Sequence, residues 1–172
     1  MEITSVNNEK IKSIVKLKQK KYRDKEGLYI GQRWFNKNGH TATFPFGHGL
    51  SYTTFEYSDL KLSMSEEGLS AQFNVKNTGK ISGSAVPMMV LTFPESIGDY
   101  PKYIFKGFEK VEFEPGENKN VNIIADDHAL SYFNVEENKY VRVNEGEIEV
   151  SISDNADPNN AKKLTSKVDA KY

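Results

Sequence analysis

The residue string that most resembles catalytic machinery is Asp126-Asp127-His128. An aspartate beside a histidine can orient the imidazole and stabilise its charged form, as general acid–base catalysis requires. Adjacent residues of an extended segment, however, point to opposite faces, and the spacing implies no serine or threonine nucleophile. Aspartate in such a string commonly accepts hydrogen bonds from the nearby backbone. We therefore interpret these residues as a turn that caps itself.

The chain has three histidines and no cysteine, which excludes thiolate metal ligands and cysteine nucleophiles. His40 and His48 could join Asp126 or Asp127 around a metal ion, but their spacing matches no known ligand pattern. Gly47-His48-Gly49 is better explained as a tight loop whose glycines permit positive φ. No glycine motif for phosphates or nucleotides is present. The sequence predicts neither a metal nor a cofactor.

A stretch of 24 residues, 31–54, is rich in glycine and aromatic side chains and shows no clean periodicity. Its candidate contact residues are Trp34, Phe44, Phe46, His48 and Tyr52. These side chains could stack on sugar rings, or they could pack against a neighbouring domain. We favour the second interpretation, because a loop this aromatic should be covered. If nothing covers it, we expect self-association through this connector.

The N-terminal segment carries most of the positive charge. Residues 1–30 contain eight Lys/Arg and four Asp/Glu, a net charge of +4, within a chain whose total is −1. The remaining residues therefore carry −5. Ile11, Ile14 and Val15 follow a helical period, so a short amphipathic basic helix is expected. Basic residues interleaved with an aromatic one can contact RNA phosphates; the candidates are Lys16, Lys18, Lys20, Lys21 and Arg23.

The elements that must position these residues are strands. From Phe55 onward the apolar residues alternate with a period of two, and turn residues interrupt the pattern every 8–12 residues. Seven or eight short strands of this kind are typical of a β-sandwich. A slip at Ser58–Asp59 and an edge or bulge at Pro87 are expected. The predicted core residues are Phe73, Val90, Leu91, Phe108, Val111, Ile123, Ile148, Val150 and Ile152.

Five strings, which follow one another in a fixed order along the chain, carry a resemblance to a known family. The string FPFGHGLSYTTFEYSDLKL, Phe44 to Leu62, stands with EGLYIGQRWF upstream and KGFEKVEFEPGE, DDHALSYFNV and NEGEIEVSIS downstream. Together these strings resemble the C-terminal end of a glycoside hydrolase family 3 β-glucosidase, over about residues 26–172. The resemblance implies an all-β, fibronectin type III-like (immunoglobulin-like) β-sandwich over residues 55–172, reached through the connector at 31–54.

The same resemblance implies what the chain lacks. Retaining hydrolysis of a β-glycoside requires two carboxyl groups about 5–5.5 Å apart. In the family these groups belong to a barrel domain and an α/β domain, and both precede the matched region. No residue of this chain matches either motif. We therefore expect a non-catalytic accessory module, with no activity of its own, whose partners are the catalytic domains of a parent protein.

Residues 3–30 are similar to the start of the substrate-binding domain of SpoU-type RNA 2′-O-methyltransferases. The two likenesses overlap at Glu26–Ile30, which suggests a chimera joined at that pentapeptide. The catalytic, cofactor-binding domain of that family is absent, so no S-adenosylmethionine chemistry follows. Two alternatives therefore stay open beside the accessory module. One is RNA binding through the basic arm 1–30, and the other is carbohydrate binding by the connector.

The sequence gives an expectation for location. No run reaches the about 18–20 apolar residues that a membrane helix needs. The N-terminal segment lacks the continuous apolar core of a secretory signal. As encoded, the chain is expected to stay in the cytoplasm and to have no membrane partner, although the family it resembles is often secreted.

Overall fold

The computed structural model describes residues 27–160 and 162–171. The predicted basic helix and the candidate RNA contacts, Lys16 to Arg23, lie outside the described residues. The described part is an all-β sandwich, as predicted, with a single α-helix among its elements, α2 (Gln32–Lys37). No helix in the described residues is long and apolar enough to cross a membrane.

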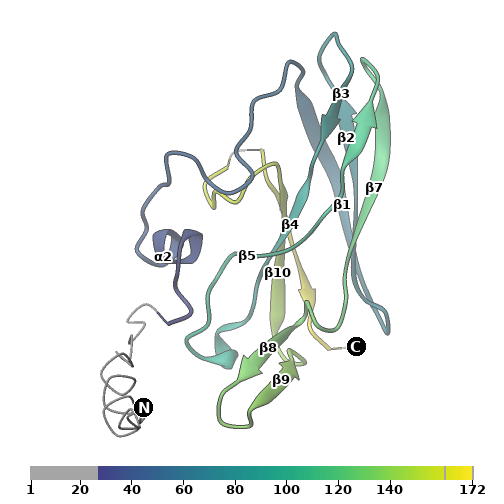
Figure 1. The fold of residues 1–172 in the computed structure, drawn as a ribbon. Coiled ribbons are helices and arrows are strands. Elements are labelled where there is room, and N and C mark those ends of the chain that lie inside the picture. The colour runs from purple at the N-terminus through teal and green to yellow at the C-terminus, as the bar shows by residue number, and fades with distance from the viewer. Residues whose placement is uncertain (1–26, 161, 172) are drawn as a thin grey trace, which may run out of the picture.

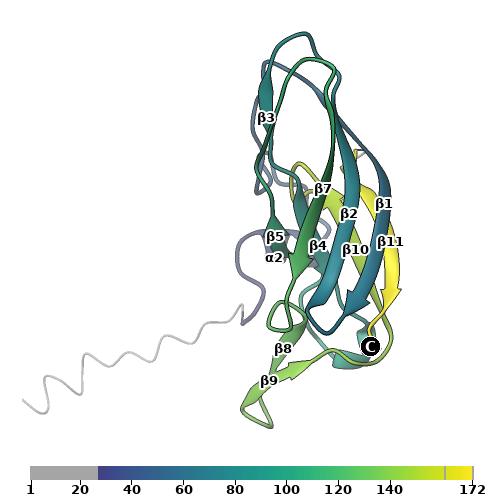
Figure 2. The same cartoon turned by 90° about the vertical axis from the view of Figure 1, so that its right-hand side faces the viewer.

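Two antiparallel sheets form the sandwich (Figures 1 and 2). One has the strand order β1-β2-β7, and the other has the order β11-β10-β4-β5. Two separate two-stranded sheets, β3-β6 and β8-β9, accompany them, and a 3₁₀ turn, η1 (Glu95–Ile97), precedes β5. The strands are β1 (Phe55–Ser65), β2 (Gly68–Asn77), β3 (Gly83–Ala85), β4 (Met88–Thr92), β5 (Ile104–Phe108), β6 (Val111–Phe113), β7 (Asn118–Ala125), β8 (Ser131–Asn134), β9 (Lys139–Arg142), β10 (Glu147–Ser153) and β11 (Leu164–Asp169).

Alternation of apolar residues places the core between the two sheets. In β2 the inward positions Leu69, Ala71, Phe73 and Val75 are fully buried, while Gln72 faces outward. The predicted core residues are buried with two exceptions. Val111 is only partly buried, and Phe108 is 58% exposed, so its assignment to the core is wrong. A register shift between Met89 and Val90 in the β4–β5 ladder explains the second error, because it changes which β5 side chains face inward.

The slip predicted at Ser58–Asp59 is confirmed, whereas Pro87 lies neither on an edge strand nor at a bulge. The β1–β2 register shifts between Ser58 and Lys61, and Asp59 adopts a positive φ of 59° at this bulge. Pro87 lies between β3 and β4, and at this point the chain passes from pairing with β6 to pairing with β10 and β5. Proline suits such a break because it cannot donate a ladder hydrogen bond.

Candidate functional site

The connector, residues 31–54, lies against the four-stranded sheet at specific points. The backbone N–H of Ala156 donates to the carbonyl of Phe46 over 2.8 Å. The Gln32 amide donates to the Ala156 carbonyl over 3.3 Å. The Phe46 ring meets the Phe105 ring of β5 edge to face, with centroids 5.3 Å apart. The loop is therefore anchored through its backbone and one ring.

Much of the connector's apolar surface is exposed. Leu50 and Tyr52 are 98% and 99% exposed, and Phe44 is 74% exposed. On the neighbouring strand, Phe105 stacks on Phe108 with centroids 6.2 Å apart. We call the three rings of Phe46, Phe105 and Phe108 the aromatic ridge. This ridge and the exposed connector residues form the apolar surface that the core does not use.

The five connector residues predicted to make contacts do not converge on one site. Trp34 stacks on His40 with centroids 5.3 Å apart, and Phe44 packs on His48 at 5.1 Å. Phe46 belongs to the aromatic ridge, and no ring partner is found for Tyr52 among the described residues. Both connector histidines therefore pack against aromatic rings. The described residues contain no group of three or more His, Asp or Glu that could hold a metal ion.

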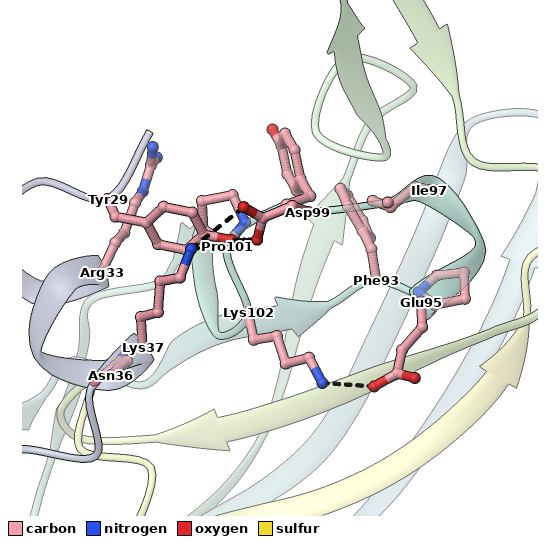
Figure 3. A pocket seen from close by; sticks show the side chains of 13 residues that line it. Tyr29, Arg33, Asn36, Lys37, Phe93, Glu95, Ile97, Asp99, Pro101 and Lys102 are labelled. Atoms are coloured by element: carbon pink, nitrogen blue, oxygen red, sulfur yellow. Dashed lines mark hydrogen bonds and ion pairs between the residues drawn. The ribbon is translucent and has the colours of Figure 1, made fainter. Parts of the chain in front are cut away.

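A hollow of about 390 Å³ opens between α2 and the loop that joins β4 to β5 (Figure 3). We call it the α2 hollow; its walls come from residues 29–37 and 93–102. Lys37 forms an ion pair with Asp99 at 3.2 Å, and the Tyr29 hydroxyl donates to the same carboxylate. The Lys37 ammonium also lies 3.5 Å from the centre of the Tyr29 ring. These contacts connect α2 to the sandwich.

The β4–β5 loop, on the other side of the α2 hollow, contributes a second ion pair and two aromatic rings. Lys102 contacts Glu95 at 2.8 Å, as Figure 3 shows. The Phe93 and Tyr100 rings stack with centroids 5.9 Å apart and an interplanar angle of 25°. This hollow is not predictable from the sequence, because its walls lie about sixty residues apart in the chain. Nothing in a single sequence pairs such segments.

The carboxyl groups of the α2 hollow are held in their charged form. The hydrogen bond from Tyr29, followed by that from Lys37, lowers the pKa of Asp99 below 3.8. The hydrogen bond from Lys102 lowers the pKa of Glu95. A glycosidase acid must instead keep its proton near neutral pH, which requires a raised pKa. These two carboxylates are therefore poorly suited to a hydrolytic acid–base role.

The structure confirms the turn predicted at Asp126-Asp127-His128. The Ala129 N–H donates to the Asp126 carboxylate over 2.8 Å, which caps the turn. Asp127 forms an ion pair with Arg142 at 2.8 Å. The His128 ring packs edge to face on Tyr140, with centroids 4.7 Å apart. The two aspartates and the imidazole therefore have separate partners. Their contacts lie in the turn before β8 and on β9.

Comparisons with known proteins agree with this architecture. Residues 85–156 match the fibronectin type III-like domain family. The chain is 39% identical over 116 residues to thermostable β-glucosidase B of Acetivibrio thermocellus, an alignment covering 65% of this chain and 15% of that protein. It is 40% identical over 134 residues to the β-glucosidase of Kluyveromyces marxianus, covering 77% of this chain and 16% of that one.

Solved structures show the same likeness. β-Glucosidase D2-BGL from Chaetomella raphigera superposes with a TM-score of 0.78 at 25% identity, over 86% of this chain and 23% of that chain. β-Glucosidase 3B from Thermotoga neapolitana, in complex with α-D-glucose, gives a TM-score of 0.76 at 34% identity, over 86% and 20%. The chain spans 15–16% of the length of the two curated relatives described above.

The fold and the matched region define the class: this is an all-β chain that carries a fibronectin type III-like domain. More particularly, that domain resembles the C-terminal fibronectin type III-like region of glycoside hydrolase family 3 β-glucosidases. These comparisons give no support to the likeness between residues 3–30 and RNA methyltransferases. The chimera and the RNA contacts therefore stay predictions.

Proposed function

We propose that this chain is a non-catalytic β-sandwich module of a β-glucosidase-type glycoside hydrolase, and that it acts in carbohydrate metabolism. In this proposal the hydrolytic carboxylates belong to catalytic domains that pack against the module. The support comes from the matched domain and from relatives that are more than six times longer than the aligned region.

The observation that carries this proposal is the contrast between a complete core and an uncovered aromatic surface. Both sheets contribute fully buried side chains, so the sandwich needs no further partner for its interior. The aromatic ridge and Phe44, Leu50 and Tyr52 nevertheless remain exposed. Exposed apolar patches of this kind mark interaction sites in soluble proteins. The ridge and connector are therefore the surface where the catalytic domains would pack.

The absence of activity is tested with the full chain and an aryl β-glucoside. We expect no turnover above the buffer blank. A rate that survives repurification and elutes with the chain would overturn the proposal. Because contaminating glycosidases are common, the Asp99→Asn and Glu95→Gln variants serve as controls. A rate that these variants change would have to arise in the α2 hollow.

The packing surface is tested by co-expressing the chain with the rest of a relative, such as the Kluyveromyces marxianus β-glucosidase without its matched segment. We expect the two polypeptides to purify together. The Phe46→Ser and Phe108→Ser changes should abolish co-purification. Phe133→Ser is the matched control, because this ring is 42% exposed but lies on the β8–β9 hairpin. Equal loss with all three changes would contradict the assignment of this surface.

A further inference from the structure

The α2 hollow combines an aromatic floor with polar groups of both kinds. Phe93 and Tyr100 form the floor, and their stacked rings extend to Tyr132, whose ring meets Tyr100 edge to face at 6.0 Å. Around this floor lie the carboxylates of Glu95 and Asp99 and the cationic side chains of Arg33, Lys37 and Lys102. Its volume of about 390 Å³ falls within the about 300–1,000 Å³ typical of small-ligand pockets.

Two hydrogen-bond donors of the hollow have no strong partner among the described residues. Arg33 forms no ion pair there, and its guanidinium makes one long hydrogen bond, 3.5 Å, to the Leu28 carbonyl. The Tyr100 hydroxyl has no hydrogen bond within the described residues, although its backbone N–H bonds to Gly98. Burial raises the pKa of Tyr100, whereas the nearby charge of Arg33 opposes that rise. The phenol therefore remains a neutral donor beside a cation.

The charges of the hollow favour one class of ligand. Lys37 and Lys102 are already paired with Asp99 and Glu95, so an anion would meet two carboxylates and one guanidinium that has no ion pair among residues 27–160 and 162–171. A purely apolar ligand would cover both ion pairs and remove water from them, which is costly. A neutral ligand that both donates and accepts hydrogen bonds is not repelled by the carboxylates. It also replaces the hydrogen bonds to water that it displaces from the ion pairs. Each carboxylate keeps lone pairs for a further donor.

From this arrangement we propose that the α2 hollow is a binding site for a gluco-configured pyranose. The flat C–H face of the sugar ring lies against the half-buried Tyr100 ring, which stacks on the buried Phe93. Arg33 and the Tyr100 hydroxyl donate to sugar oxygens, while Asp99 accepts from a sugar hydroxyl. The choice of sugar rests on the proposed function, whereas the place and the chemistry come from the hollow itself.

The test titrates glucose and cellobiose into the full chain, with myo-inositol as a polyol that lacks the pyranose ring. Calorimetry gives the affinity, and ¹H–¹⁵N NMR shows which backbone amides respond. We expect saturable binding in the millimolar range, with shifts at residues 98–102, and none with myo-inositol. Arg33→Gln and Tyr100→Phe should each weaken binding about tenfold, because each removes one polar contact.

Tyr52→Phe is the matched control for Tyr100→Phe, since it deletes the same phenol oxygen from a fully exposed side chain of the connector. It should bind as the unmodified chain does. No saturation at tens of millimolar, or shifts confined to Phe44 and Tyr52, would overturn the proposal. Binding that neither Arg33→Gln nor Tyr100→Phe alters would also overturn it. None of these results bears on hydrolysis or co-purification, so the two proposals can fail separately.

Discussion

Two phenylalanines that the sequence pattern treats alike have opposite environments. Phe73 is fully buried in β2, while Phe108 is 58% exposed at the end of β5. We expect Phe73→Ala to lower the free energy of unfolding by about 3–5 kcal/mol, because it removes a core side chain and leaves a cavity. Phe108→Ala should cost less than about 0.5 kcal/mol, as surface changes usually do. Urea denaturation of both variants measures this, and similar losses would contradict the assignment.

Gly47 is required by the backbone, and Gly49 is not. Gly47 has φ +83°, and an added Cβ would lie 2.5 Å from Met88 Cε and 3.1 Å from the Asp154 carbonyl oxygen. We expect Gly47→Ala to cost about 1–3 kcal/mol, through backbone strain and displacement of Met88. At Gly49 an added Cβ would meet no atom closer than the Gly47 carbonyl oxygen, 4.0 Å away. Thermal unfolding should therefore leave this second variant unchanged, and equal destabilisation would contradict the account.

At the residue scale, the sequence predicted local backbone conformation better than it predicted contacts between residues distant in the chain. The positive φ in the Gly47 loop and the capped turn at Asp126 follow from local chemistry, which is why both were predictable. The contact of Phe46 with Phe105 joins residues 59 positions apart. No local rule predicts it. The misplacement of Phe108 has the same origin, since inward and outward positions in β5 depend on a register shift in its partner strand.

At the scale of elements, α2 is attached to the sandwich through a titratable group. The pKa of Asp99 lies below its usual 3.8 because Tyr29 donates to its carboxylate and Lys37 pairs with it. A carboxyl group whose pKa is lowered by folding stabilises the contact above its unfolded pKa. That stabilisation is lost as the pH falls through the lowered value. We therefore expect the Lys37–Asp99 contact of α2 to weaken only as the pH falls below about 3.8.

Fluorescence of Trp34 measures this weakening, because Trp34 is the only tryptophan in the sequence and lies in α2 beside Lys37. Asp99→Asn should make the low-pH change disappear. Asp59→Asn is the control, since the pKa of Asp59 is also lowered, by hydrogen bonds from Ser58 and Asn74 in the β1–β2 ladder. A Trp34 transition that Asp59→Asn removes, or that persists in Asp99→Asn, would contradict this role of Asp99.

The strands were predictable where alternation is continuous and unpredictable where it is short. β1, β2, β7 and β10 follow the period of two closely, whereas β8 was not predicted as a strand. Four residues of β8, SYFN, give too little alternation to distinguish a strand from a turn. The α2 hollow needs both α2 and η1 beside the end of β4, and this placement depends on the assembled sheet.

For the whole molecule, the uncovered aromatic ridge predicts self-association of the isolated chain. Phe46, Phe105 and Phe108 are 38–58% exposed, and burying them against a second copy removes apolar surface from water. Sedimentation velocity should show dimers or larger species as the concentration rises. A variant carrying Phe46→Ser, Phe105→Ser and Phe108→Ser should sediment as a monomer, whereas Phe133→Ser should still associate.

The dependence on salt distinguishes association through the aromatic ridge from association through opposite charges. The net charge is +4 over residues 1–30 and −5 over the remainder, so two copies could also attract through opposite charges. Such attraction weakens as salt screens it, whereas association through the ridge should persist in sodium chloride and strengthen in sulfate. A monomer at every concentration, or association that moderate salt abolishes, would show that the ridge does not drive self-association. The expected dependence on sulfate would instead link the exposed rings directly to the behaviour of the chain in solution.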